Sequence, residues 1–496
     1  MNVLCLSMPD WFEHMAPVAI RMPNGALGSL AGNVDGAHRV AVADLILAHR
    51  SVRRTVERLV RELQPDVVAL SVMTFQRHTA LALSRLVRAL RPGVRVVAGG
   101  YDPSLDPDAY ADPEGGADFL VRGEGEHIFS ELLRALATGG GFQGIAGLSW
   151  REGERLHHNP GRPVLKPENG DIRLPDRGAR VLKGYALLGR PVDVVETSRG
   201  CTFDCSFCSI VEMRGRNFHR FPLERVMDDI RDATRRGARA IFIVDDNVML
   251  DVPRFEALCD AIVRAGLHRN HYLVQAMTSS IADHGERLAP LMKRAGFRYV
   301  FLGIENVLEE DLGFLKARAK NLRHEGGRAV GNATLAAIEH LHRQGIFVVG
   351  GLIVGSPGDT AESVAANLDF ARRYVDWPYI QHPTPYPRTP MTRDLVRRGL
   401  VLHQRLEEYD GTTAVVRSEH LEAAEIEFLR WKAERWMKLR HFPQAFRHNP
   451  AFCIVRGPAM IAHTLRGSWR ALLGLESQRQ AFERYRAIRR AERVHL

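Results

Sequence analysis

Cysteine is scarce in this sequence, because only six of the 496 residues are cysteines. That excludes a disulfide scaffold of the kind that stabilises small secreted proteins. No apolar run reaches the roughly 18–20 residues needed to cross a bilayer. The N-terminal residues 1–5 lack a basic region and a signal-peptide cleavage site. The cysteines look unpaired, and with the oxygen-sensitive metal motif described below they predict a protein of the reducing cytoplasm.

The composition is otherwise that of an ordinary globular protein, with 45% apolar and 25% charged residues. The length suffices for two or three domains. The net charge of +10 is concentrated at the end of the chain, since residues 411–496 hold 16 Lys and Arg against 8 Asp and Glu. Any electrostatic partner is therefore expected at this tail.

Three cysteines stand close together in the order C-x-x-x-C-x-x-C, at Cys201, Cys205 and Cys208. A structural zinc site would need four ligands, commonly two C-x-x-C pairs, and no second pair is present. Three thiolates can instead hold three corners of a cubane iron–sulfur cluster and leave one iron open to a ligand. The motif therefore predicts Cys201, Cys205 and Cys208 as both the metal ligands and the catalytic centre.

The cysteine run, with Phe207 before its last member, resembles the signature of the radical SAM enzymes. The resemblance implies a 4Fe-4S cluster whose open iron binds S-adenosylmethionine (SAM), with Phe207 beside it. It also implies an electron donor such as flavodoxin or ferredoxin. The remaining cysteines, Cys5, Cys259 and Cys453, are too dispersed for a second cluster and are expected to be buried thiols.

Apolar strand-like segments alternate with helical patterns through residues 1–143, which predicts a doubly wound, Rossmann-like parallel sheet. The predicted strands are Val3–Ser7, Val40–Leu45, Val67–Val72, Val94–Ala98 and Phe119–Val121, and the predicted helices are Arg53–Leu63, Thr79–Leu90 and Glu126–Leu136. Ligands of such sheets bind beyond the carboxyl ends of the strands.

Polar residues and glycines follow three of these strands, and in this order they resemble the cobalamin-binding domain found ahead of many radical SAM domains. The loop Pro23–Gly28 resembles that family's early loop. The residues that the resemblance assigns to cobalamin are Ser71, Thr74, Gly99, Gly100, Tyr101, Gly123, Glu124 and Gly125. The D-x-H-x-x-G motif that supplies an axial histidine is missing, which implies either base-off binding without a histidine or a domain that binds no corrin.

Residues 144–192 are predicted to be a hairpin followed by a proline-rich linker. Residues 193–410 then show six strand–helix units, which predicts a partial TIM-like barrel. The predicted strands are Asp193–Thr197, Ile241–Val244, Tyr272–Gln275, Tyr299–Gly303, Phe347–Val354 and Tyr379–His382. The predicted helices are Leu223–Arg236, Arg254–Ala265, Leu288–Ala295, Thr334–Gln344 and Glu362–Tyr374.

Polar residues and glycines gather at the carboxyl ends of these barrel strands, where barrel enzymes place their chemistry. The resemblance to radical SAM enzymes assigns them to SAM: Asp245, Asp246, Gln275 and Glu305 to polar contacts, and Gly350 and Gly351 to the adenosine. Solvated strand ends are the alternative interpretation. Tyr386, in the proline-rich segment after the sixth strand, is a candidate on the substrate side.

Residues 411–496 are predicted to form a basic helical extension, with helices at Leu421–Leu439 and Gln478–Arg493 and interruptions at Pro443, Pro450 and Pro458. Three roles stay open for it: a cap on the barrel, a solvated face, or peripheral contact with a membrane or an anionic substrate. No nucleic-acid recognition module accompanies its arginines, so no nucleic-acid partner is expected.

The combined resemblance implies a cobalamin-dependent radical SAM methyltransferase. Such an enzyme transfers a methyl group from SAM, through methylcobalamin, to an unactivated carbon of a small-molecule or lipid substrate. Three alternatives stay open: a cyclase or rearrangement enzyme with the same cofactors, an oxidoreductase with an empty N-terminal domain, and a non-catalytic iron–sulfur scaffold.

Overall fold

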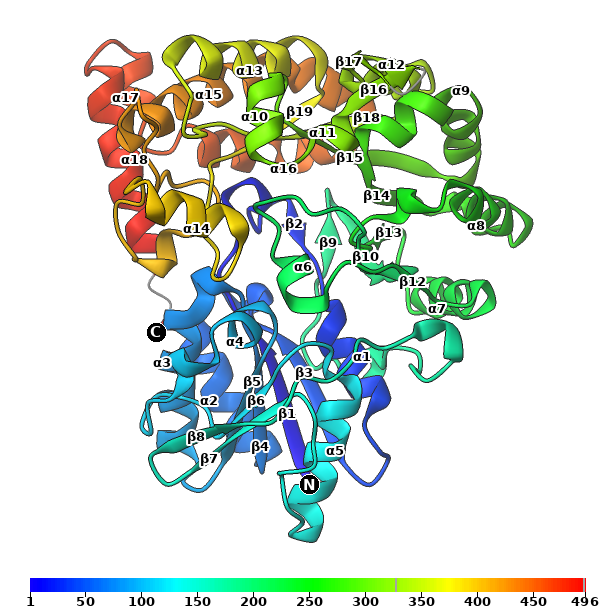
Figure 1. Ribbon diagram of the computed structural model, residues 1–496, viewed down its shortest axis with the longest axis vertical. Helices are drawn as coiled ribbons and strands as arrows, with labels where there is room; N and C mark the ends of the chain where they lie inside the picture. The colour runs from blue at the N-terminus through cyan, green and yellow to red at the C-terminus, as the bar shows by residue number, and fades with distance from the viewer. Residues whose placement is uncertain (326–327, 494–495) are drawn as a thin grey trace.

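The computed structural model describes residues 1–325, 328–493 and 496. Two α/β parts of the chain, each with its own sheet and helices, are stacked along the long axis of the molecule, and a helical extension lies beside the second (Figure 1). The N-terminal part, in blue and cyan, lies below the barrel, in green and yellow. The predicted fold class, a Rossmann-like domain followed by a partial barrel, is confirmed.

The N-terminal sheet has seven strands in the order β3-β1-β4-β5-β6-β7-β8. Five of them are parallel: β1 (Asn2–Ser7), β3 (Arg39–Asp44), β4 (Val67–Ser71), β5 (Arg95–Gly99) and β6 (Phe119–Val121). The hairpin of β7 (Leu148–Glu152) and β8 (Arg155–His158) continues this sheet antiparallel to β6. The order reverses between β1 and β4, which is the switch point where doubly wound sheets open a ligand crevice.

Helices cover both faces of this sheet, because the side chains along each strand point alternately to one face and to the other. Leu4 and Leu6 face one buried cluster, whereas Val3 and Cys5 face the other. The first cluster contains α2 (Val52–Leu63) and α3 (Arg77–Leu90), and the second contains α1 (Gly25–Asn33) and α5 (Gly125–Thr138). Helix α1 replaces the loop expected at Pro23–Gly28, since the Asn24 side chain accepts a hydrogen bond from the amide of Leu27 and caps it.

The second sheet has the order β19-β18-β15-β14-β13-β10-β9-β2 and curls into a half-barrel. Six strands are parallel: β10 (Arg190–Val195), β13 (Ala240–Ile243), β14 (His271–Met277), β15 (Phe297–Glu305), β18 (Phe347–Ile353) and β19 (Trp377–Gln381). The short strands β9 (Ala186–Leu187) and β2 (Ile20–Arg21) extend it antiparallel. Because β2 comes from the N-terminal region, that region contributes directly to the barrel sheet.

Helices of the half-barrel follow the strands in turn and bury one large apolar cluster against them. They are α7 (Leu223–Arg235), α8 (Val252–Arg264), α9 (Thr278–Ala295), α12 (Thr334–Arg343) and α13 (Ala361–Tyr374). Between β10 and α7 lie the short elements β11 (Ser198–Arg199), α6 (Ser209–Arg214) and β12 (His219–Arg220). Between β15 and α12 lie α10 (Glu309–Phe314), α11 (Arg318–Asn321), β16 (Leu322–Glu325) and β17 (Arg328–Asn332). The short helix α4 (Tyr101–Leu105) belongs to the N-terminal part, where it follows β5. Helix α9 begins ten residues before the predicted start.

The C-terminal extension consists of α15 (Ala423–His448), α16 (Pro450–Thr464), α17 (Trp469–Leu472) and α18 (Gln478–Glu492), preceded by α14 (Pro390–Arg397). The predicted interruptions at Pro443 and Pro458 are wrong, because both prolines lie inside helices. Pro443 is exposed, so water can satisfy the carbonyl freed by its missing amide. No helix in the described residues is long and apolar enough to span a bilayer.

Candidate functional site

The cysteine loop runs from β11 to α6 at the carboxyl end of β10. Strands β11 and β12 pair antiparallel and close the loop at its base. Gly200 begins the loop with φ of +86°, and a Cβ there would lie 2.4 Å from Asn217 Oδ1, so only glycine fits. At the other end Cys208 is the N-cap residue of α6.

The three predicted ligands line one cavity of about 110 Å³, which we call the cysteine cavity. Its remaining lining comprises Phe203, Phe207, Ile210, Val211, Asp246, Asn247, Gln275, Ala276, Met277, Phe301, Gly303, Glu305 and Lys320. The loop is held against the barrel by Ser206, whose amide donates to Leu315 O at 3.0 Å and whose hydroxyl donates to Phe314 O at 2.8 Å. The sulfurs are therefore presented by a braced loop rather than a free one.

The donor set fits a cubane cluster. All three thiols are free of disulfides, and thiolates are the usual ligands of iron–sulfur centres. In the described part of the chain, no group of three or more His, Cys, Asp or Glu side chains is placed to hold a single metal ion. A cubane does not require such a group, because its cysteines bind different iron atoms.

The thiols lie in a desolvated environment. Burial raises the pKa of Cys205 to about 11 and that of Cys208 to about 12. At neutral pH both thiols are thus protonated in the metal-free chain. Cluster assembly must displace these protons, as metal binding to thiols generally does.

Four residues that the sequence assigned to SAM lie in the cysteine cavity: Phe207, Asp246, Gln275 and Glu305. Asp245 does not line it. Its carboxylate accepts hydrogen bonds from Thr197 N at 2.6 Å, Thr197 Oγ1 at 2.5 Å and Ser198 Oγ at 2.5 Å. Asp245 therefore ties the end of β13 to the start of the cysteine loop.

Gly350 and Gly351 also lie outside the cysteine cavity, in β18. A Cβ on Gly350 would meet Val375 at 2.5 Å, and a Cβ on Gly351 would meet the ring of Phe301 at 2.7 Å. Both glycines thus permit close packing within the barrel. Phe301, which sequence reasoning missed, is the residue whose ring reaches the cavity from this side.

Lys320 is a second residue that sequence reasoning missed. It comes from α11, between two strands of the barrel, and its Nζ lies 2.7 Å from Glu305 Oε1. Burial alone would lower the pKa of Lys320, but Glu305 and the thiols of Cys205 and Cys208 raise it above its usual value. Glu305 itself has φ of +59°, a costly conformation for a non-glycine residue, at an irregularity in the β15–β18 pairing.

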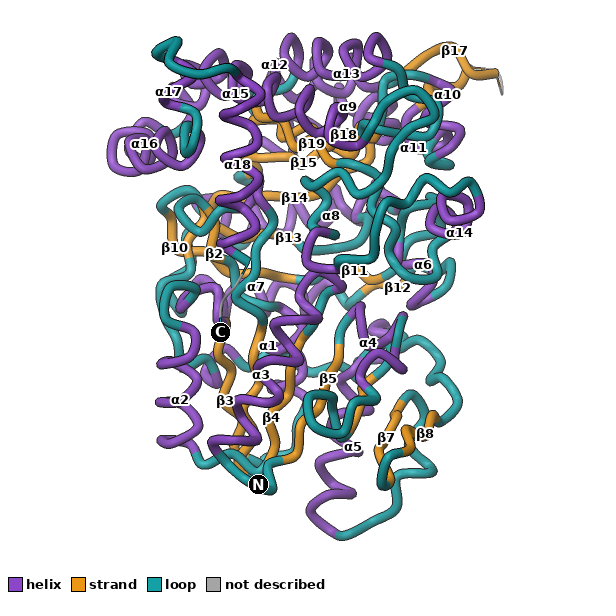
Figure 2. Tube along the Cα trace, turned by 90° about the vertical axis from the view of Figure 1, so that its left-hand side faces the viewer, coloured by secondary structure: helices purple, strands orange, loops and turns teal. Residues whose placement is uncertain are grey.

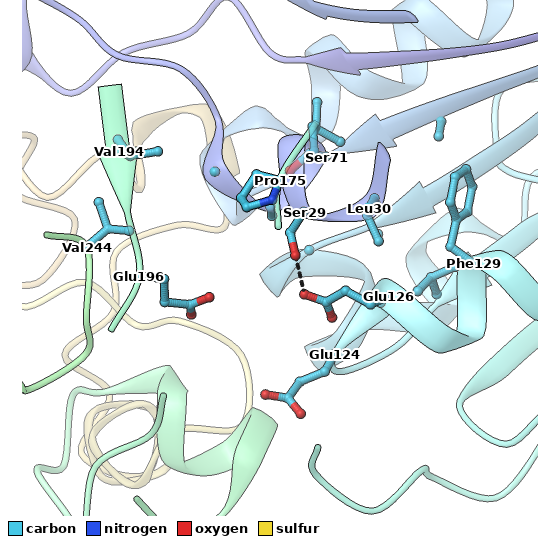
Figure 3. Close-up of a pocket in the computed structure, with 18 of the residues that line it drawn as sticks. Ser29, Leu30, Ser71, Glu124, Glu126, Phe129, Pro175, Val194, Glu196 and Val244 are labelled. Carbon is cyan, nitrogen blue, oxygen red and sulfur yellow. Dashed lines mark hydrogen bonds between the residues drawn. The ribbon is translucent and has the colours of Figure 1, made fainter. Parts of the chain in front are cut away.

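A larger cavity of about 310 Å³ lies at the carboxyl ends of the N-terminal strands, and we call it the glycine-edge cavity (Figure 3). Seven of the eight residues assigned to cobalamin line it: Ser71, Gly99, Gly100, Tyr101, Gly123, Glu124 and Gly125. Thr74 does not; it is buried in a short 3-10 helix. The barrel contributes Val194, Glu196 and Val244, so the cavity lies between the N-terminal domain and the barrel.

The lining of the glycine-edge cavity suits contact with part of a large, flat ligand such as a corrinoid. Its volume is at the lower end of small-molecule sites, about 300–1,000 Å³. Its floor combines strand-end glycines with the apolar side chains of Leu30, Val97 and Phe129. Gly123 has φ of +84° and open space where a Cβ would stand, so a flat ligand can approach the backbone there.

Carboxylates crowd the wall of this cavity around Arg199, the residue just before Gly200. The Arg199 guanidinium lies 2.6 Å from Glu126, 2.8 Å from Glu196 and 3.6 Å from Glu124. Burial would raise the pKa of Glu126, but Arg199 and the Ser29 hydroxyl lower it to about 2. This ionic cluster fastens the N-terminal domain to the cysteine loop.

The two cavities meet at one ion pair. Arg214 lines the glycine-edge cavity, Asp246 lines the cysteine cavity, and Arg214 Nη1 lies 3.1 Å from Asp246 Oδ2. Tyr101 lines the glycine-edge cavity and is also close to Asp246 and Cys208 of the cysteine cavity. Its burial, together with these two neighbours, raises the pKa of Tyr101 above the usual value. A group in one cavity is therefore a direct neighbour of a group in the other.

Two family models match the chain. Residues 15–133 match the B12 binding domain, and residues 195–371 match the radical SAM superfamily. The first match covers the strands and glycines that line the glycine-edge cavity. The second covers the cysteine loop and most of the half-barrel.

Several curated proteins are similar to this chain. An uncharacterised methyltransferase of Pyrococcus horikoshii is 27% identical over 87% of this chain and 91% of its own length. The hopanoid C-3 methylase of Methylococcus capsulatus is 30% identical over 51% of this chain and 48% of its own length. The anaerobic magnesium-protoporphyrin IX monomethyl ester cyclase of Rubrivivax gelatinosus is 23% identical over 84% and 74%.

A solved structure shares the fold. The radical S-adenosylmethionine methyltransferase TsrM of Kitasatospora setae, with cobalamin and a [4Fe-4S] cluster bound, superposes with a TM-score of 0.63. It is 21% identical, and the match covers 80% of this chain and 78% of that one.

Proposed function

Because this chain is a radical SAM enzyme with an N-terminal B12-binding domain, we propose that it transfers a methyl group from SAM to an unactivated carbon of a small-molecule or lipid substrate. The observation that carries the proposal is the contact between the two cavities. Arg214 and Asp246 belong to different cavities and form one ion pair. Groups held in the two cavities would thus lie on either side of the same few side chains.

The residues divide the work between two sites. Cys201, Cys205 and Cys208 would hold the cluster, and Asp246, Gln275 and Glu305 would bind polar groups of SAM. The glycine edge would hold the corrinoid through Gly99, Gly100 and Gly123. When bound, the cluster with SAM supplies one-electron chemistry and the corrinoid supplies a transferable methyl group.

The protein's own contribution is positioning and exclusion of water. Asp246 accepts hydrogen bonds from the Gly200 amide at 2.8 Å and from Arg214, so its orientation is fixed before any ligand enters. Phe207 packs in an apolar cluster with Phe75 and Tyr386, which spans the N-terminal domain, the cysteine loop and the segment after β19. Such a cluster keeps water from the space between the N-terminal domain and the barrel.

Tyr386 is a proposed substrate-side residue. It packs in the same apolar cluster, and its hydroxyl donates to Tyr409 O at 3.3 Å. An apolar surrounding favours a substrate that presents hydrocarbon at the reacting carbon. An electron donor such as flavodoxin or ferredoxin is proposed as the partner that reduces the cluster.

The test uses full-length protein reconstituted anaerobically with iron, sulfide and hydroxocobalamin, then given a strong reductant and SAM labelled on its methyl group. We expect 5′-deoxyadenosine to form and the label to be recovered with the protein-bound corrinoid. If 5′-deoxyadenosine forms but the label stays in SAM and in the cleavage products of SAM, methyl transfer is contradicted. Absence of bound corrinoid would favour an oxidoreductase with an empty N-terminal domain, and absence of 5′-deoxyadenosine would favour an iron–sulfur scaffold.

Ring closure is the second candidate, because a cyclase matches the chain over 84% of its residues. Both candidates use the same two cavities, so binding experiments do not separate them. Once a substrate is found, its product decides between the two. A product heavier by one labelled methyl group supports the methyltransferase, and a cyclised product without the label supports the cyclase.

A further inference from the structure

The end of α15, α16 and α17 carry positive charge without any negative charge. Residues 435–475, which we call the apolar–basic segment, contain seven Lys or Arg and no Asp or Glu. The nearest carboxylates in sequence are Glu434 and Glu476, one on either side. In Figure 2, α16 is seen end-on at the margin of the molecule with α17 next to it.

The same segment exposes most of the large apolar side chains that the described residues leave on the surface. Eleven of the seventeen exposed large hydrophobic residues fall within it. They are Trp436, Leu439, Phe442, Phe446, Ile454, Val455, Ile461, Trp469, Leu472, Leu473 and Leu475. Val455 is 72% exposed, Leu473 66% and Trp469 55%, so these side chains are not the edges of a buried core.

The exposed apolar residues of α15 lie on one side of that helix. Trp436, Leu439, Phe442 and Phe446 follow spacings of three, three and four residues, which place side chains along one helical face. Helix α16 packs against α15 and adds Ile454, Val455 and Ile461. Apolar surface of this extent on a protein marks an interaction site.

Three arginines of the segment, Arg440, Arg447 and Arg456, are exposed, and within the described residues none pairs with a carboxylate. The arginines of α18 differ. Arg489 lies 2.7 Å from Asp410, and Arg493 lies 2.5 Å from the same carboxylate. The basic charge of the tail thus divides into an inward set that fastens α18 and an outward set beside the exposed apolar residues.

We propose that the apolar–basic segment docks this protein on the surface of an anionic lipid bilayer. Helices with apolar side chains on one face and Lys or Arg around them lie in the bilayer interface, and tryptophan prefers that depth. Anionic lipid supplies the negative charge that the segment lacks. A second copy of the chain would bring Arg440, Arg447 and Arg456 against the same three charges, which disfavours self-association through this face.

The experiment is co-sedimentation of the full-length protein with phosphatidylcholine vesicles made with and without phosphatidylglycerol. We expect the wild type to pellet with the anionic vesicles and to be released as ionic strength rises. The triple variant Arg440→Glu, Arg447→Glu, Arg456→Glu should bind anionic vesicles at least about tenfold more weakly. The double variant Trp469→Gln, Leu473→Gln should also bind more weakly, although its charge is unchanged.

The matched control is Val396→Gln with Leu402→Gln, which removes two exposed apolar residues outside the segment and should pellet like the wild type. All variants alter exposed side chains, and unchanged thermal unfolding checks that they fold. The proposal is overturned if the wild type stays in the supernatant with anionic vesicles, or if the charge-reversed variant binds as well as the wild type. Sedimentation that shows a dimer lost in Trp469→Gln, Leu473→Gln would assign the face to a second copy instead and would equally overturn it.

Discussion

Arg214 Nη1 lies 3.1 Å from Asp246 Oδ2, and the two side chains line different cavities. Arg214 comes from the end of α6, after the cysteine loop, whereas Asp246 follows β13. Asp246 also accepts the Gly200 amide, so the carboxylate connects the start of the cysteine loop to its end. One ion pair thus holds the loop closed and separates the two cavities.

Breaking this pair from one side should destabilise the protein more than removing both charges. Arg214→Met leaves Asp246 largely buried without its cation, and we expect a loss of about 3 kcal/mol in the free energy of unfolding. The double variant Arg214→Met, Asp246→Asn should lose less than the sum of the single variants, with a coupling of about 1–3 kcal/mol. Urea unfolding of the four proteins measures this cycle. Arg264→Met, at an exposed arginine of α8, is the control, and strictly additive losses would contradict a coupled pair.

Removing one cysteine of the loop should abolish cluster assembly but not corrinoid binding. Cys205→Ala takes away one of three ligands, and we expect reconstituted iron to fall to background with no 5′-deoxyadenosine formed. Bound hydroxocobalamin, measured by absorbance, should stay near the wild-type level because the glycine-edge cavity is lined by other residues. Cys453→Ala, a cysteine of α16 remote from the loop in sequence, serves as the control. Loss of corrinoid together with iron would show that the two cavities do not bind independently.

Lys320 should affect the cluster electrostatically. Lys320→Met removes a buried positive charge beside Cys205 and Cys208 and leaves Glu305 without its partner at 2.7 Å. We expect a more negative reduction potential of the cluster and at least about a tenfold slower SAM cleavage, with partial recovery in Lys320→Arg. Lys316→Met is the matched control, since Lys316 is half exposed and lies 3.6 Å from Asp204 at the surface. Equal potentials in both variants would refute the role of Lys320.

Glu126 should make the stability of the protein depend on acid pH. Its pKa falls from 4.5 to about 2 in the folded chain, so its ionised form stabilises the fold above about pH 4.5 and this contribution is lost as the pH falls toward 2. We expect Glu126→Gln to be less stable than the wild type at pH 7, and about 2 kcal/mol of that difference to be lost by pH 3. Urea unfolding at several pH values measures it, with Glu154→Gln, exposed in the turn between β7 and β8, as control. A difference independent of pH would contradict the pairing with Arg199.

Local sequence patterns predicted the order of strands and helices well. Every strand predicted in the two sheets is present, because buried parallel strands are short apolar runs and amphipathic helices repeat their apolar residues at helical spacing. The cysteine motif could be found for the same reason, since its three ligands lie within one loop. Residues at or near the carboxyl end of a strand, such as Gly99 in β5 and Gln275 in β14, could be placed at that edge of the sheet without knowing the packing.

Contacts between distant segments could not be predicted. Strand β2 joins the barrel sheet through two residues, too few to give a periodic pattern. Pro443 was expected to interrupt the chain between two helices, but α15 continues through it because the helix packs on α13 and β19 and the proline faces solvent. Propensity is a local preference, and tertiary packing overrides it.

The sequence by itself determined which chemistry the chain can support, because ligand type and spacing are properties of one short loop. Only the tertiary structure decided which residues share a cavity. Lys320 reaches the cysteines from α11, and Arg214 meets Asp246 across more than thirty residues of chain. It also decided that Asp245, next to Asp246, ties the chain together instead of lining the cavity. Both residues lie beyond the end of β13, and only the fold shows which of the two faces the site.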